Sequence, residues 1–223
     1  MTRRPDLVVV VAGTATDVGK TFVAAALLGR LRATGTRVAA RKPAQSFAPG
    51  DARTDADVLA DATGEDPTAV CPRQRWYETP MAPPMAAEAL GRPSFTIDDL
   101  VSELDWPAAV DVGLVETAGG VRSPLAADGD CASLALALTP DLVVLVADAG
   151  LGTINAVRLS AGALGRLPVV VLLNRFDRGH ELHGRNRRWL AGRDGYEVVT
   201  AVGALAERVR SISTRVDQQG PPA

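Results

Sequence analysis

The hydrophobic positions of this chain fall into short continuous runs. Residues 8–12 are all apolar, and further runs, most of them rich in β-branched residues, recur later in the chain. Such runs are typical of parallel strands that are buried on both faces. The pattern predicts strands at residues 8–12, 37–40, 111–116, 142–147, 169–173 and 196–200.

Helical patterns separate these predicted strands. They cover residues 21–33, 55–62, 154–164 and 204–211. Alternation of strand and helix implies right-handed crossovers and a mostly parallel sheet with helices on both faces. We therefore predict one α/β domain spanning residues 1–223, a three-layer sandwich in which residues 213–223 form a flexible tail.

The first predicted strand runs into a glycine-bounded loop and then into a helix. The segment from Gly13 to Thr21 reads GTATDVGKT, with Thr14 where the first glycine of the common pattern stands. Small residues let backbone N–H groups at a helix N-terminus approach phosphate oxygens. Lys20 can then reach the β- and γ-phosphates, and the Thr21 hydroxyl can bind Mg²⁺. The order of elements predicts a P-loop NTPase fold.

Polar residues follow the other predicted strands at their carboxyl ends, where ligands of a parallel sheet bind. Glu116 ends one strand, and an acidic residue at this place holds Mg²⁺ in P-loop proteins. Asp57 lies at the start of the second predicted helix, where either Asp55 or Asp57 is also a candidate helix cap. We predict a metal site of Thr21, Asp57 and Glu116, with the choice between Asp55 and Asp57 left open.

Lys42 stands at the end of the second predicted strand, directly before Pro43. The proline disfavours a helical backbone for Lys42 and so fixes the direction of its side chain. A second fixed lysine beside a P-loop suggests neutralisation of charge in a transition state. Lys20 and Lys42 are therefore the predicted catalytic residues, with a surface lysine as the alternative for Lys42.

Composition narrows the possible partners. The chain has 24 Lys and Arg against 26 Asp and Glu, a formal net charge of -2, which does not indicate nucleic-acid binding. Cys71 and Cys131 are far apart, so we expect reduced thiols and no zinc site. No signal peptide or membrane span is expected, which favours a cytoplasmic protein. The proline-rich stretch 66–93 is either an ordered wall of a ligand site or a surface connection.

Together these motifs resemble those of the dethiobiotin synthetase family. The P-loop matches with Ala15 in place of Asp, and residues 42–46 match Lys-Pro-x-x-Ser. Residues 115–120 match Val-Glu-Gly-Ala-Gly-Gly except for Thr117, and residues 151–155 match Leu-Gly-x-Ile-Asn. The resemblance weakens after residue 174, where the family's Ile-Pro-Trp-Leu segment corresponds to Val-Gly-Ala-Leu at 202–205.

The resemblance implies an ATP- and Mg²⁺-dependent enzyme of biotin biosynthesis that converts 7,8-diaminononanoate and CO2 to dethiobiotin, ADP and phosphate. It implies a carbamate, then a carbamic-phosphoric anhydride, and a homodimer with a shared active site. The implied nucleotide contacts are Gly13, Thr14, Thr16, Asp17, Val18, Gly19, Lys20, Thr21, Phe22, Glu116, Thr117, Ala118, Gly119, Asn174, Arg175, Gly203, Ala204 and Leu205. The implied substrate contacts are Thr16, Lys42, Ser46, Gly120, Leu151, Gly152, Thr153 and Asn155. Among the nucleotide contacts, Asn174 is the residue that the resemblance implies for contact with the base, and preference among ATP, CTP and GTP stays open.

Three other functions fit a P-loop chain of this length. A regulatory NTPase switch of the partitioning or metallochaperone type often carries an extra lysine inside the loop, which is absent here. The synthetase half of a glutamine-dependent amidotransferase is normally fused to a glutaminase, for which 223 residues leave no room. A binding module without turnover is the third, and phosphate release in the presence of substrate separates it from an enzyme.

Overall fold

The computed structural model describes residues 4–219. Its helices are α1 (Lys20–Arg32), α2 (Asp55–Thr63), α3 (Pro67–Val70), α4 (Pro83–Ala89), α5 (Ile97–Ser102), α6 (Cys131–Leu138), α7 (Thr153–Ala163), α8 (Glu181–Gly192) and α9 (Val202–Gln219). Its strands are β1 (Leu7–Gly13), β2 (Val38–Arg41), β3 (Gln45–Ser46), β4 (Trp76–Tyr77), β5 (Val112–Glu116), β6 (Pro124–Ala126), β7 (Gly129–Asp130), β8 (Leu142–Asp148), β9 (Val169–Asn174) and β10 (Glu197–Val199).

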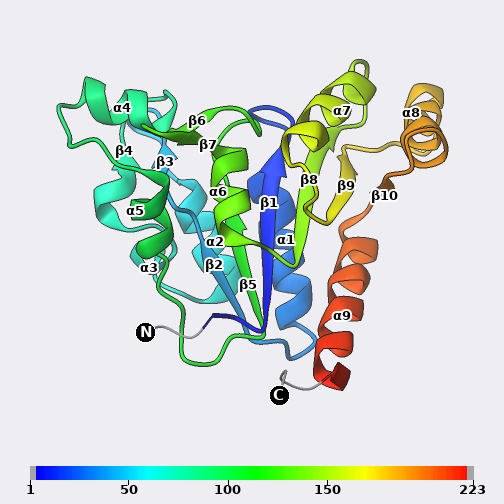
Figure 1. Cartoon of the computed structure of the whole chain (residues 1–223), viewed down its shortest axis with the longest axis horizontal. Helices are drawn as coiled ribbons and strands as arrows, with labels where there is room; N and C mark the ends of the chain where they lie inside the picture. Colours follow the sequence, from blue (N-terminus) through cyan, green and yellow to red (C-terminus); the bar gives the residue numbers. More distant parts are fainter. Residues whose placement is uncertain (1–3, 220–223) are drawn as a thin grey trace.

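The centre of the fold is a parallel sheet with the strand order β10-β9-β8-β1-β5-β2. β1 lies between β5 and β8, and all seven of its residues are buried. Val10 pairs with Val115 on one side and with Val143 on the other. Because the strands are parallel, their carboxyl ends meet at one edge, the upper one in Figure 1.

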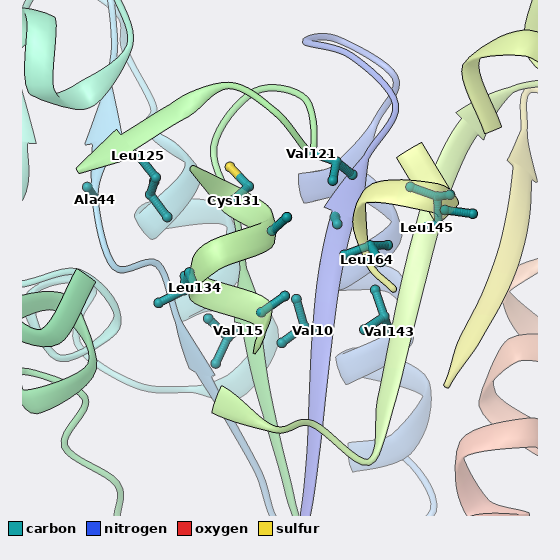
Figure 2. Packing of buried hydrophobic residues seen from close by; sticks show 14 of the residues in the cluster. Val10, Ala44, Val115, Val121, Leu125, Cys131, Leu134, Val143, Leu145 and Leu164 are labelled. Carbon is teal, nitrogen blue, oxygen red and sulfur yellow. The ribbon is translucent and has the colours of Figure 1, made fainter. Parts of the chain in front are cut away.

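Helices cover both faces of the sheet, as predicted. Val10, Val115 and Val143 belong to the hydrophobic cluster that includes side chains of α6, α7 and α8, and Figure 2 shows part of it, with Leu134 of α6 close to Val115. The alternate residues Val9 and Leu114 belong to the opposite cluster, with side chains of α1, α2 and α9. Burial on both faces explains why the strands read as unbroken apolar runs.

Regular structure extends beyond the predicted helices and strands. The stretch 66–93 contains helix α4, whose prolines occupy its first positions, where a missing N–H costs nothing. The predicted tail from residue 213 is helical through Gln219, and residues 220–223 lie outside the described part. Helices α5, α6 and α8 were not predicted. For α6 the available signal was the capping box between Asp130 and Ser133.

Both cysteines are buried and free, as expected. Among residues 4–219, no helix combines the length and the apolar character that crossing a membrane requires.

Candidate functional site

The P-loop leaves β1 at Gly13 and enters α1 at Lys20. Gly19 caps the helix in the left-handed conformation, with φ of 92°. A Cβ on Gly13 would lie 2.9 Å from the Lys20 side chain, so the loop folds tightly only with glycine there. The ammonium of Lys20 donates to the Ala15 carbonyl at 3.2 Å and curls over the loop. The prediction of a P-loop between β1 and α1 is confirmed.

Replacing Gly19 by alanine is expected to lower ATP affinity more than tenfold. The left-handed backbone costs alanine about 1–2 kcal/mol, and the new Cβ would overlap the Asn174 amide nitrogen. Gly35→Ala is the matched control, because Gly35 has φ of 86° and nothing within 4 Å of its Cβ position. Thermal unfolding measures the stability of the two variants, and calorimetric titration with ATP measures their affinity. Equal losses in the two variants would contradict the role of the Asn174 contact.

A buried charge cluster lies beside the P-loop. Lys42 is 2% exposed, and its ammonium is 2.7 Å from Oε1 of Glu116 and 2.7 Å from Oδ2 of Asp55. The Thr21 hydroxyl lies 2.8 Å from Oδ1 of Asp55 and 2.8 Å from Oε1 of Glu116. Strand ends β2 and β5 thus meet the starts of α1 and α2 at one point, as the sheet order requires.

The charged groups in this cluster shift one another's pKa values. Burial alone would lower the pKa of Lys42, but the carboxylates of Glu116 and Asp55 outweigh it and hold that pKa above its usual value. The Lys42 charge is the main reason why the pKa of Asp55 is lowered. Burial raises the pKa of Glu116, against the effect of Lys42. Burial and the charge of Lys42 lower the pKa of Lys20. Lys42 therefore stays protonated at neutral pH.

The structure corrects the prediction of Asp57 as a metal ligand. The Asp57 carboxylate accepts from the backbone N–H and hydroxyl of Thr54 at 2.8 and 2.9 Å and forms the capping box of α2. Asp55, two residues earlier, faces Thr21 and Lys42 instead. Helical geometry turns positions two apart toward different sides, so one carboxylate caps the helix and the other enters the site.

The oxygen atoms around Thr21 fit a hard divalent cation. One hydroxyl and two carboxylates converge there, and Mg²⁺ takes such oxygen ligands. Oε2 of Glu116 is buried and has no hydrogen-bond partner among the described residues. A buried carboxylate oxygen without a partner is costly, and a bound cation would satisfy it.

The P-loop and the charge cluster open into a cavity of about 760 Å³. Its lining brings together twelve of the predicted residues: Thr16, Asp17, Gly19, Lys20, Thr21, Phe22, Lys42, Ser46, Glu116, Ala118, Gly119 and Arg175. Asp55, the alternative to Asp57, also lines the cavity. So do residues that the sequence does not assign to a site: Gln45, Met81, Ala82, Ser123 and Pro124, besides Pro80 and Pro83 of the proline-rich wall. The stretch 66–93 therefore does form part of the wall.

Gln45 and Ser123 support the walls through polar contacts. The Gln45 side chain donates to the Thr54 hydroxyl at 3.2 Å and accepts from the Ala56 N–H at 3.0 Å, which anchors the start of α2. The Ser123 hydroxyl accepts from the Gly120 N–H at 2.9 Å and braces the turn after β5. Gln45 stands at an unspecified position of the Lys-Pro-x-x-Ser motif, so only the fold reveals its contact.

Several predicted residues lie outside the cavity lining. Thr117 turns its hydroxyl to the Val11 carbonyl at 3.3 Å and is fully buried, so its side chain does not reach the cavity. Leu205 is fully buried in the hydrophobic cluster under α1, so its side chain cannot contact a base in the cavity. The other predicted residues absent from the lining are Gly13, Thr14, Val18, Asp57, Gly120, Leu151, Gly152, Thr153, Asn155, Asn174, Gly203 and Ala204.

The predicted residues after β8 do not line the cavity, whereas those at the end of β9 contact the P-loop. Leu151 is 93% exposed, and Gly152 caps α7 with φ of 89°. Asn174 ends β9 and donates its amide to the Val18 carbonyl at 2.9 Å. Arg175 follows it with φ of 54° and reaches the P-loop.

Comparison with known proteins gives consistent results. A protein family described as an AAA domain matches residues 8–208. The chain is 41% identical over 157 residues to an ATP-dependent dethiobiotin synthetase BioD of Rhodococcus erythropolis, covering 70% of this chain and 68% of the relative. It is 38% identical over 218 residues to that of an Anaeromyxobacter species, covering 92% and 95%.

Solved structures match in fold at low identity. A plasmid partition protein from Borrelia burgdorferi aligns with a TM-score of 0.55 and 13% identity, over 96% of this chain and 99% of that one. Chloroplast FtsY from Physcomitrella patens aligns with a TM-score of 0.50 and 18% identity, over 94% of this chain and 66% of that one. Likeness at this level of identity shows a shared P-loop NTPase fold.

Proposed function

The chain belongs to the ATP-dependent dethiobiotin synthetase family, and from this premise we propose that the cavity above its P-loop is the active site of that synthesis in biotin biosynthesis. The reaction joins 7,8-diaminononanoate and CO2 at the expense of ATP. The observation that carries the proposal is the convergence of Lys42 on Glu116 beside the P-loop. A nucleotide-binding loop alone does not require a second, fully buried lysine.

The chemistry needs positioning and charge neutralisation. One amine of the substrate adds to CO2 and loses a proton, which gives a carbamate. A carbamate oxygen attacks the γ-phosphorus of ATP, and ADP leaves with the electrons of the broken P–O bond. The second amine then attacks the carbamate carbon, and phosphate leaves as the ureido ring closes. Every step places negative charge on oxygen atoms, of the carbamate, of ADP or of phosphate, so fixed cations are what the protein must supply.

Lys20 and Lys42 are the cations that can neutralise this negative charge. Lys20, at the first turn of α1, is the residue for the β- and γ-phosphates. Lys42, held 2.7 Å from both carboxylates, is the residue for the transferring phosphoryl group and the carbamate. Thr16 and Ser46 line the same cavity and offer hydroxyls for the substrate amines or the carbamate.

Thr21, Asp55 and Glu116 are the residues that would hold Mg²⁺. A magnesium ion there would neutralise the phosphate oxygens of the nucleotide. Asp55 replaces Asp57 in this proposal because its carboxylate, unlike that of Asp57, lies beside the Thr21 hydroxyl.

A homodimer and a cytoplasmic location complete the proposal. Leu151 is exposed, and neither Leu151 nor the glycine-capped start of α7 lines the cavity of its own chain. Both are therefore free to contact a second copy, which supports the homodimer. A second copy would bring residues 151–155 to the substrate's carboxylate, and sedimentation of the full chain measures the oligomeric state. Two free cysteines are consistent with a reducing compartment.

The test is phosphate release with Mg·ATP and bicarbonate, with and without 7,8-diaminononanoate. We expect release to depend on the diamine and to be matched mole for mole by dethiobiotin, identified by mass spectrometry. Turnover of ATP at the same rate without the diamine would contradict the proposal and favour a regulatory NTPase switch, which shares this fold.

A further inference from the structure

Two consecutive carbonyls of the P-loop are held by side chains from the end of β9. The Asn174 amide nitrogen donates to the Val18 carbonyl at 2.9 Å. The Arg175 guanidinium donates to the Asp17 carbonyl at 2.7 Å. These contacts join segments that are 156 and 158 residues apart in the chain. The Arg175 side chain is itself oriented by an ion pair with Asp148, at 3.0 Å, from the end of β8.

Holding a carbonyl also orients the N–H of the same peptide group. In a planar trans peptide the N–H and the C=O point in opposite directions. A fixed Asp17 carbonyl therefore directs the Val18 N–H away from Arg175, and a fixed Val18 carbonyl directs the Gly19 N–H away from Asn174. Backbone N–H groups in this part of a P-loop are the ones that bind phosphate oxygens.

The backbone at Arg175 shows that the side chain matters there. Arg175 has φ of 54° and its contact Asp17 has φ of 58°, both in the left-handed region. Glycine adopts this conformation without steric cost, whereas arginine does not. An arginine at such a position is favoured only if its side chain makes a contact that glycine cannot make.

We propose that Asn174 and Arg175 form a clamp that presets the P-loop for phosphate, so that both act as positioning residues for the phosphate chain of the nucleotide. The inference rests on the proposed nucleotide site and deepens it. It differs from the sequence prediction, in which Asn174 contacts the base, because the contact that the structure shows for the Asn174 amide is with the Val18 carbonyl of the P-loop. The two roles predict opposite results for a ligand that has phosphates but no base.

The experiment is calorimetric titration of the full chain with Mg·ATP and with inorganic tripolyphosphate. Arg175→Gly and Asn174→Ala are compared with wild type, and Arg158→Met is the control, since Arg158 also pairs with an aspartate, Asp194 at 2.6 Å, but outside the cavity. We expect each clamp variant to lose about tenfold in affinity for both ligands, the order of magnitude for the loss of one hydrogen bond. The control is expected to bind as wild type does.

Thermal unfolding without ligand separates positioning from folding. Arg175→Gly is expected to unfold at the same or a higher temperature than wild type, because glycine relieves the left-handed backbone. A lower unfolding temperature together with weaker binding would overturn the clamp in favour of a structural role. Weaker binding of ATP with unchanged binding of tripolyphosphate would overturn it in favour of base contact.

The failure of the clamp and the failure of the nucleotide site give different results. If wild type binds both ligands and the clamp variants bind them equally well, the clamp is wrong and the nucleotide site stands. If wild type binds neither ATP nor tripolyphosphate, the proposed nucleotide site is wrong, and the clamp proposal, which rests on that site, is wrong too.

Discussion

Replacing Lys42 by methionine is expected to lower diamine-dependent phosphate release at least a hundredfold, within the range of about 10²–10³ for loss of one preorganised electrostatic group. The same change leaves Asp55 and Glu116 without their shared cation. Breaking a buried ion pair from one side costs roughly 3–5 kcal/mol of stability. Lys42 is 2% exposed and Glu116 is fully buried, so their ion pair is shielded from solvent.

We expect Mg²⁺ to restore part of the stability that Lys42→Met loses. In wild type the ammonium of Lys42 lies 2.7 Å from both Asp55 and Glu116, so it would compete with a metal ion for these carboxylates. Without the ammonium, Mg²⁺ becomes the natural counter-ion, and it should raise the unfolding temperature of Lys42→Met more than that of wild type. Steady-state phosphate release and thermal unfolding with and without Mg²⁺ measure the two effects.

Arg41→Met is the matched control for this experiment. Arg41 is the neighbouring residue, is 4% exposed and pairs with Glu65 at 2.7 Å, but it does not line the cavity. We expect it to lose stability without a comparable loss of turnover and without rescue by Mg²⁺. Equal stabilisation of both variants by Mg²⁺ would contradict the competition between Lys42 and the metal.

Asp55→Asn and Asp57→Asn are expected to have different effects although the residues are only two apart. Asp55→Asn removes a charged oxygen from the proposed metal site, so the Mg²⁺ concentration for half-maximal turnover should rise more than tenfold. Asp57→Asn weakens the capping box of α2, which costs about 1 kcal/mol of stability, and should leave the Mg²⁺ requirement unchanged. Mg²⁺ titrations of turnover and denaturant unfolding of both variants measure this difference. The opposite pattern would restore Asp57 as the ligand.

The sequence predicted the site best where the site is local in the chain. The P-loop lies on one continuous strand-loop-helix segment, and both its elements were found where the pattern placed them. Lys42 and Glu116 were identified because each ends an apolar strand. The choice of lysine is a further signal in the sequence. Lys20 and Lys42 are the only two lysines among the 24 Lys and Arg residues, and all the others are arginines.

Prediction was weaker where a side chain's direction decided its role. Asp55 and Asp57 stand in the same short acidic segment, and only the position of α2 relative to Thr21 shows which one enters the site. The motif resemblance places Leu205 at the nucleotide, but Leu205 packs in the core because α9 begins three residues earlier, at Val202. For Asn174, the sequence does not indicate the hydrogen bond that one N–H of its amide donates to the Val18 carbonyl of the P-loop.

The sequence by itself determined the class of fold and the phosphate-binding loop. Strands buried on two faces need unbroken apolar residues, and a loop that approaches phosphate needs glycine, so both requirements are written locally in the chain. The tertiary structure alone decided how distant strand ends meet. The order β9-β8-β1-β5-β2 is not encoded in any local period, and it is this order that brings Lys42 to Glu116 and Arg175 to Asp17.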